Sequence, residues 1–284
     1  MADAATVDRL EHLAAQMRYH IVTMMGANKV HHFGGSLSAT DLVTALYFYK
    51  MRYDPKNPAW PERDRFIMSK GHSVPAQYVA LAMKGVLSVE ELPTLKQLGA
   101  RLQGHPAMHL TPGLEGCTGS LGQGLSYANG MALAGLITRR DYHVYCLIGD
   151  GELDEGQNWE AAMTSATECL HNVTAIVDRN GLKAMDTTKC GRITPPLAER
   201  WAAYGWAVRE IDGHDMGQIC DALDWATSVY DGPQVIIART VKGKGISFTE
   251  NQAAFHNSAV TPEQYATALA EIKAKLARWE GSPA

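Results

Sequence analysis

The stretch YHVYCLIGDGELDEGQNWEAAMTSATECLHNVTAIVDRN, residues 142–180, decides the fold. Two apolar, β-rich runs, 142–148 and 173–177, flank a segment that is rich in Ala, Met and Glu, 157–170. A strand, a helix and a second strand in this order predict a β-α-β unit, in which the two strands are parallel. Gly149-Asp150-Gly151-Glu152 follows the first run, and Asp178-Arg179-Asn180 follows the second. Both polar motifs are therefore expected at the carboxyl ends of neighbouring strands, where open α/β sheets bind ligands.

Oxygen atoms at this edge of the sheet predict a metal ion bound together with a diphosphate. Asp150 offers a carboxylate, Asn180 an amide oxygen and Leu182 a main-chain carbonyl. Hard cations such as Mg²⁺ or Ca²⁺ take oxygen ligands of this kind, and Mg²⁺ usually adds phosphate oxygens. Gly151 lets the backbone approach a phosphate, to which its amide can donate. The plainer alternative is an Asp-Gly turn and an asparagine in a β-turn, but the strand–helix–strand context favours the metal–diphosphate site.

Strands that alternate with helices are expected along the rest of the chain. Further β-rich runs occur at 65–68, 207–211 and 235–239, and helical patterns occur at 6–28, 41–49, 123–138, 216–230 and 261–279. More helical sequence follows Pro75 and Ser88, whereas 99–118 and the segment around His32 have the turn residues of loops. This order predicts an α/β fold with a doubly wound, mostly parallel sheet and helices on both faces, in one domain over residues 1–284.

Composition excludes several classes of function. The chain has 284 residues, of which 46% are hydrophobic and 20% charged, as in ordinary globular proteins. Its formal net charge of −4 and its lack of a basic stripe argue against a nucleic-acid partner. It has no apolar run long enough to span a membrane and no secretory signal at its N-terminus, so the cytoplasm is the expected compartment.

Four histidines lie in loop-like sequence, three of them close to glycine or proline: His32, His72, His105 and His256. Neutral imidazoles can donate or accept hydrogen bonds near neutral pH, so histidines in such segments are candidates for a site. The alternative for each is a surface or turn histidine. The remaining histidines that are expected to be structural or exposed are His12, His20, His109, His143, His171 and His214.

Further motifs follow one another along nearly the whole chain: His32-Phe33-Gly34-Gly35-Ser36-Leu37, Arg63-Asp64-Arg65-Phe66, Ser69-Lys70-Gly71-His72, Gln103-Gly104-His105-Pro106, Thr118-Gly119-Ser120-Leu121-Gly122-Gln123-Gly124, Glu155-Gly156, Asp212-Gly213-His214, Lys242-Gly243-Lys244-Gly245 and His256. Together with the two motifs of the 142–180 segment, this ordered set resembles the thiamine diphosphate enzymes, and transketolase most of all. One departure is His31, which stands where the family commonly has glycine.

The resemblance implies a role for each matching residue. His32 and His105 match histidines that bind substrate hydroxyls, and His72 and His256 match histidines along the cofactor diphosphate and the substrate channel. Gly119 and Leu121 match main-chain positions at the aminopyrimidine of thiamine diphosphate; Asp150, Gly151, Asn180 and Leu182 match the diphosphate–metal site. Lys242 matches a basic residue near the diphosphate, or is a solvated loop lysine. Glu155 and Glu160 match acidic residues that couple two active sites at a subunit interface, or are solvated helix residues.

The resemblance also implies a partner, because it covers only the first half of a transketolase. The family's pyrimidine-binding domain carries the glutamate that activates the cofactor, and the chain has no candidate for it. The chain is therefore expected to be the N-terminal subunit of a split transketolase, active with a C-terminal subunit in an α2β2 heterotetramer on sugar or sugar-phosphate substrates. The alternatives are a 1-deoxyxylulose-5-phosphate synthase-like enzyme, the α subunit of an oxo-acid dehydrogenase, or a non-catalytic regulatory subunit.

Overall fold

Parallel strands form one sheet through the middle of the computed structural model, which describes residues 2–184, 187 and 196–280. The strands are β1 (Arg65–Met68), β2 (Val144–Gly149), β3 (Val173–Arg179), β4 (Ala207–Asp212) and β5 (Gln234–Arg239), and their order in the sheet is β1-β2-β3-β5-β4. All four pairings are parallel. Every strand predicted from the sequence is present.

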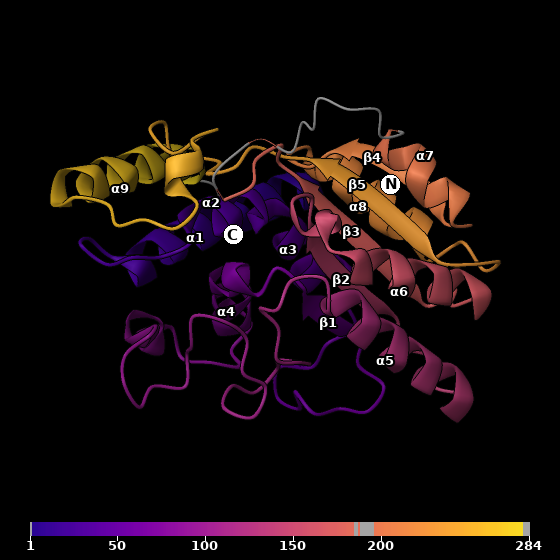
Figure 1. The fold of residues 1–284 in the computed structure, drawn as a ribbon. Helices are drawn as coiled ribbons and strands as arrows, with labels where there is room; N and C mark the ends of the chain where they lie inside the picture. The colour runs from indigo at the N-terminus through magenta and orange to yellow at the C-terminus, as the bar shows by residue number, and fades with distance from the viewer. Residues whose placement is uncertain (1, 185–186, 188–195, 281–284) are drawn as a thin grey trace.

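The central strands are buried on both faces, which explains why each reads as a continuous apolar run. Successive side chains point to opposite faces. Leu147 and Ile176 join a core with α1 (Ala4–Met25), α4 (Val74–Met83), α8 (Met216–Ala226) and α9 (Pro262–Leu276). Cys146 and Val177 join a second core with α5 (Gly124–Thr138), α6 (Gly156–Thr167) and α7 (Leu197–Ala203). Figure 1 shows the two helical layers with the sheet between them, so the doubly wound α/β prediction is confirmed.

One predicted loop is helical. The sequence predicts a loop around His32 and a helix that begins at Asp41, but α2 (Phe33–Ser38) starts directly after His32 and continues into α3 (Thr40–Ala45) and the π-helical turn η1 (Leu46–Lys50). The two glycines that suggested a loop are needed for close packing instead. A Cβ on Gly35 would lie 2.5 Å from Ser73 Oγ, and a Cβ on Gly34 would lie 2.8 Å from Lys242 Cγ. Tertiary packing thus overrides the low helix propensity of glycine.

The other differences are small. Ser88 caps a helix as predicted, but the helix is the 3₁₀ turn η3 (Val89–Thr94), which contains Pro93. Helix α7 was not predicted. Three further 3₁₀ turns, η2 (Gly71–Ser73), η4 (Glu152–Asp154) and η5 (Ala253–Phe255), lie next to predicted site residues, and η6 (Ala277–Trp279) ends the described chain. Within the described ranges, no helix is both long and apolar enough to cross a membrane.

Candidate functional site

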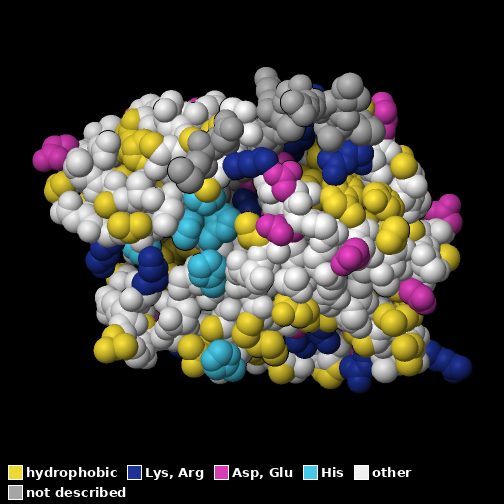
Figure 2. Space-filling view, viewed as in Figure 1, with side chains coloured by type: hydrophobic (Ala, Val, Ile, Leu, Met, Phe, Trp, Pro, Cys, Tyr) yellow, Lys and Arg dark blue, Asp and Glu magenta, His cyan; other side chains and the backbone are white. Residues whose placement is uncertain are grey.

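A cavity of about 320 Å³ lies at the carboxyl ends of β1, β2 and β3. It is lined by nearly all of the residues predicted for the site: His32, His72, His105, Gly119, Leu121, Asp150, Gly151, Asn180, Leu182, Lys242 and His256. Figure 2 shows the histidines gathered in a hollow, with Lys or Arg and Asp or Glu side chains beside them. Segments far apart in the sequence therefore meet where the β-α-β unit predicts a ligand site.

The four loop histidines form one cluster. The ring of His32 lies 4.9 Å from that of His72, 5.4 Å from that of His256 and 6.1 Å from that of His105, measured between centroids. Burial lowers the pKa of His32 and of His256 to about 4, and neighbouring cationic groups add to the effect. Burial also lowers the pKa of His72 and His105. At neutral pH the cluster therefore offers neutral imidazoles, which can both donate to and accept from hydroxyl groups.

The departure at His31 causes no strain. Its φ is not positive, so the backbone does not require glycine there. His31 pairs with Ser258 in an isolated bridge, and this bridge holds the segment before His32 against the segment after His256.

Asp150 and Asn180 join the ends of β2 and β3. One Asp150 carboxylate oxygen accepts the amide of Gly151 at 2.9 Å and the other accepts the amide of Gly181 at 2.7 Å. Asn180 Oδ1 accepts the amide of Leu182 at 3.1 Å. Burial and the nearby charge of Asp178 raise the pKa of Asp150 to about 6. A carboxylate that is costly to ionise in this fold gains most from a bound cation, so the site fits a hard metal ion.

A buried ion pair that was not predicted as part of the site lies beneath it. Lys70 Nζ donates to Asp178 and, at 3.0 Å, to the carbonyl of Gly35; both side chains are almost fully buried. Ser38 and Thr240 also donate to Asp178. Burial alone would raise the pKa of Asp178, but the charge of Lys70 and these hydrogen bonds hold it below its ordinary value. Both residues stand in motifs quoted above, and a charged residue at the end of an apolar strand is the signal that points to them.

Glu152 is a third residue that sequence reasoning missed. It lines the cavity, is 3% exposed, and accepts from the Ser69 hydroxyl at 2.5 Å and from the amides of Gly122 and Gly149 at 2.9 and 3.0 Å. Its carboxylate therefore holds the glycine-rich segment of Gly119 and Leu121 against the end of β2.

Lys242 reaches into the cavity from the segment after β5. Its Nζ donates to the carbonyls of Leu182 and Lys183 at 3.2 and 2.8 Å and lies 2.9 Å from His256 Nδ1. Burial and the charge of Lys70 lower the pKa of Lys242 to about 8. The carbonyl of Leu182, which was predicted to bind the metal, thus accepts a hydrogen bond from the ammonium group of Lys242.

The segment that carries Lys242 is anchored by His214, which is partly buried. Arg18 makes a bidentate ion pair with Asp41 at 2.8 and 2.6 Å, and Asp41 accepts from His214 Nδ1 at 2.7 Å. His214 Nε2 in turn accepts the amide of Val241 at 2.8 Å. The structural role expected of His214 agrees with these contacts.

Glu155 and Glu160 do not reach this cavity. Both are exposed: Glu155 caps the start of α6, and Glu160 lies on that helix beside a shallow groove with Gln157 and Gly130.

The cavity wall fits a diphosphate with its metal. Gly119 has a φ of +140°, and a Cβ there would lie 2.7 Å from His105 Cδ2, so its main chain borders the cavity without a side chain. Among the described residues no group of three or more His, Cys, Asp or Glu side chains could hold a metal ion. A metal here would therefore depend on one carboxylate, amide and carbonyl oxygens, and the phosphates of its ligand.

Known proteins are similar to this chain in both sequence and fold. Residues 10–277 match the family described as transketolase, thiamine diphosphate binding domain. The chain is 44% identical over 264 residues to the 6-deoxy-6-sulfo-D-fructose transketolase subunit SqwG of Clostridium sp. (strain MSTE9), covering 93% of this chain and 96% of that protein. It is 40% identical to an apulose-4-phosphate transketolase subunit of Phocaeicola vulgatus, covering 96% of this chain and 97% of that protein.

Full-length transketolases match over part of their length. Human transketolase is 34% identical over 96% of this chain and 44% of its own. The crystal structure of transketolase from Campylobacter jejuni superposes with a TM-score of 0.84 at 28% identity, covering 96% of this chain and 48% of that one. The chain therefore belongs to the transketolase family, and it corresponds to that family's N-terminal, thiamine diphosphate-binding part.

Proposed function

We propose that this chain is the N-terminal, diphosphate- and metal-binding subunit of a transketolase, which transfers a two-carbon ketol unit from a ketose or ketose phosphate to an aldose or aldose phosphate. The observation that carries the proposal is the cavity in which four neutral histidines meet Asp150 and Asn180. Imidazoles suit sugar hydroxyls, and the oxygen ligands suit a metal diphosphate.

The cofactor and metal we propose are thiamine diphosphate and Mg²⁺ (or Ca²⁺). Thiamine diphosphate supplies a nucleophilic carbon that can carry the two-carbon unit. Asp150, Asn180 and the carbonyl of Leu182 would hold the metal. The amide of Gly151 and the side chains of Lys242, His72 and His256 would hold the diphosphate. Gly119 and Leu121 would place the aminopyrimidine through their main chains.

The remaining chemistry falls to the histidines. His32 and His105 both line the cavity, and their lowered pKa values keep them neutral at pH 7, so each can donate to or accept from a substrate hydroxyl. His72 and His256 are close enough to His32 to complete a hydrogen-bonding surface for a polyhydroxylated chain. Lys70 neutralises Asp178, so the floor of the site adds little net negative charge against a diphosphate.

A second polypeptide would complete the site. Relatives that match along nearly their whole length are named as transketolase subunits. We propose a C-terminal subunit with a pyrimidine-binding domain that donates the activating glutamate, in a cytoplasmic α2β2 heterotetramer. In this assembly residues 1–284 act as one cofactor-binding domain, and the exposed Glu155 and Glu160 lie at an interface, where they couple two sites.

Reconstitution with a candidate partner tests the proposal. Thiamine diphosphate with Mg²⁺ is titrated calorimetrically into the chain alone and into the mixture, and ketol transfer is followed with a ketose donor and with pyruvate. We expect turnover of the ketose only in the mixture. Turnover by the chain alone would contradict the split site, turnover of pyruvate would indicate a decarboxylating enzyme, and binding in neither sample would indicate a regulatory subunit.

A further inference from the structure

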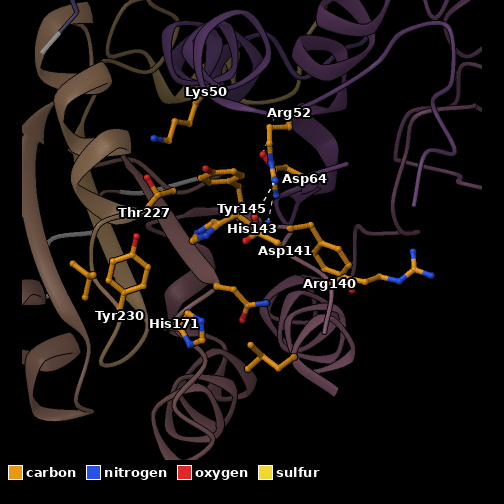
Figure 3. Close-up of a pocket in the computed structure, with 14 residues that line it drawn as sticks. Lys50, Arg52, Asp64, Arg140, Asp141, His143, Tyr145, His171, Thr227 and Tyr230 are labelled. Atoms are coloured by element: carbon orange, nitrogen blue, oxygen red, sulfur yellow. Dashed lines mark hydrogen bonds and ion pairs between the residues drawn. The ribbon is translucent and has the colours of Figure 1, made fainter. Parts of the chain in front are cut away.

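A separate cavity of about 330 Å³, drawn in Figure 3, is lined by residues from the opposite end of the sheet to the cofactor cavity. Its wall is made by residues at the amino ends of the strands and by the segment after α8, among them Asp64, His143, Tyr145, His171 and Thr227. It shares no lining residue with the cofactor cavity. Nothing in the proposed ketol transfer uses it.

Tyr145 presents a hydroxyl to this cavity without a protein partner. The residue lies on β2 and is 1% exposed, yet its hydroxyl makes no hydrogen bond to any residue that the structure describes. In Figure 3 the ring points from β2 toward Lys50 and Thr227. Because this hydroxyl faces the cavity and has no protein partner, it is available to hydrogen-bond with a ligand or with water.

His143 adds a hydrogen-bond acceptor beside Tyr145, since the two rings are 4.7 Å apart. Gln234 Nε2 donates to the carbonyls of His171, Val229 and Gly232, so Gln234 Oε1 must accept the proton of the Thr174 hydroxyl. Thr174 can then only accept at 2.7 Å from His143 Nε2, which therefore carries a hydrogen. In the neutral ring Nδ1 is left as an acceptor, and no contact in the described part of the chain satisfies it.

The charges around the cavity pair with one another. Lys50 lies 2.8 Å from Asp224, Arg52 lies 3.1 Å from Asp64 and 3.3 Å from Asp141, and Arg140 lies 3.3 Å from Glu62. The basic groups are thus matched or slightly outnumbered by carboxylates. An anionic ligand would find each of these basic groups already paired with a carboxylate, and an ammonium ligand would find each of these carboxylates already paired with a basic group.

We propose that this cavity binds an uncharged, polyhydroxylated small molecule, such as a sugar without a phosphate group. A hydroxyl group can accept from Tyr145 and donate to His143 Nδ1, which a carboxylate or a phosphate cannot do as well. The exposed ring of Tyr230 and the side chain of Val229 offer apolar surface for the carbon face of such a ligand. The inference does not depend on the proposed ketol transfer, because none of its residues belongs to that site.

The test is a titration of the full chain, labelled with ¹³C in its tyrosine rings, with D-ribose. The Tyr145 resonance is assigned from its loss in Tyr145→Phe. We expect this resonance to shift and saturate with a dissociation constant in the millimolar range, as is usual for small neutral ligands. In Tyr145→Phe, the affinity measured from the sugar's own signals should fall about 3- to 10-fold, the usual effect of one hydrogen bond.

Three controls make the result decisive. Tyr47→Phe also removes a buried hydroxyl, the partner of Gln77, but lies outside the cavity and should leave binding unchanged. His32→Ala alters the cofactor cavity and should leave the Tyr145 shift unchanged. D-ribose 5-phosphate and inorganic phosphate should bind more weakly than D-ribose. A Tyr145 resonance that does not move, a shift that His32→Ala abolishes, or tighter binding of phosphate would overturn the proposal, and the first outcome would leave water as the partner of Tyr145.

Discussion

Lys70 and Asp178 show how single residues set the electrostatics of the site. Both lie at the carboxyl ends of strands that are otherwise apolar, and both are buried. Each charge is tolerated only because of the other and because Ser38, Thr240 and the Gly35 carbonyl complete the hydrogen bonding.

Replacing Lys70 with methionine tests this dependence. Lys70→Met keeps the volume but leaves the Asp178 carboxylate buried without its cation. We expect a loss of about 3–5 kcal/mol in the free energy of unfolding, measured by urea denaturation. The matched control is Arg101→Met, which breaks the partly exposed pair with Glu91 and should cost less than about 1 kcal/mol. A loss for Lys70→Met no larger than that of the control would mean that the pair is not energetically coupled.

Asp150→Asn separates function from stability. The pKa of Asp150 is raised to about 6, so the fold disfavours its ionised form; asparagine removes that charge but keeps only one of the two oxygens that accept the amides of Gly151 and Gly181, so the free energy of unfolding of the free chain should fall by no more than about 1–3 kcal/mol. Mg²⁺-dependent affinity for thiamine diphosphate should fall by about 100-fold or more if Asp150 is the charged metal ligand that we propose.

The control for Asp150→Asn is Asp8→Asn, whose side chain is 61% exposed and lies outside the cavity. It should bind the cofactor like the original chain. Equal affinities of the two variants, measured calorimetrically, would refute the metal role of Asp150.

At the scale of elements, helix α5 is held against the sheet by a glycine at its start. A Cβ on Gly124 would lie 2.2 Å from Ser69 Oγ and 2.7 Å from Ser69 Cα, which is backbone, so the neighbour cannot simply rotate away. Ser69 in turn donates to Glu152 at the cavity floor. The position of α5 is therefore tied to the position of the site.

Two glycine-to-alanine substitutions in α5 should change the free energy of unfolding in opposite directions. Gly124→Ala overpacks the contact with Ser69 and should destabilise the chain by about 1–3 kcal/mol. Gly130→Ala, in the same helix, meets no atom within 4 Å and should stabilise the chain by about 0.5–1 kcal/mol, because alanine restricts the unfolded chain. Chemical denaturation of both variants measures the difference. Gly124→Ala as stable as Gly130→Ala would show that α5 can shift away from β1.

The elements are largely predictable because local sequence determines them. Strands such as β2 and β3 are buried on both faces and read as apolar runs, and α9 carries its capping signal in Thr261 and Gln264. Helix α2 is not predictable in this way, because its two glycines look like a loop and only their contacts with Ser73 and Lys242 make them helical.

Site residues that belong to a sequence motif are predictable, whereas residues whose role depends on a contact with a distant part of the chain are not. Asp150 and Asn180 follow from the β-α-β unit, and the histidines follow from the resemblance. Lys70 and Asp178 are 108 positions apart in the sequence, and nothing in the sequence around either residue indicates that the two form an ion pair. The tautomer of His143 likewise depends on Thr174 and Gln234, which only the register of β2, β3 and β5 brings together.

At the scale of the whole molecule, the sheet separates two sites of different charge character. At its carboxyl edge, the cofactor cavity combines three lysines (Lys70, Lys183 and Lys242) with two carboxylates (Asp150 and Glu152) and neutral histidines, so cationic groups can face a diphosphate and anionic groups can face a metal ion. At its amino edge, the cations are already paired with carboxylates. The two proposals therefore place an anionic ligand at one end of the same parallel sheet and a neutral ligand at the other.

The histidines together predict how stability depends on pH. The pKa values of His31, His32 and His256 are lowered to about 4 and that of His143 to about 3, in each case mainly by burial. The unfolded chain takes up these protons near pH 6.5 but the folded chain does not, so their contribution is complete above pH 6.5 and is lost as the pH falls toward 4. Each histidine contributes at most about 1.4 kcal/mol per pH unit over that window.

The free energy of unfolding, measured in urea at pH 7.5, 6.0 and 5.0, should therefore fall steadily below pH 6.5. His143→Gln should flatten the slope, since one of these groups is removed; a stability that is constant or rises from pH 7.5 to 5.0 would show that the imidazoles are not held neutral by the fold.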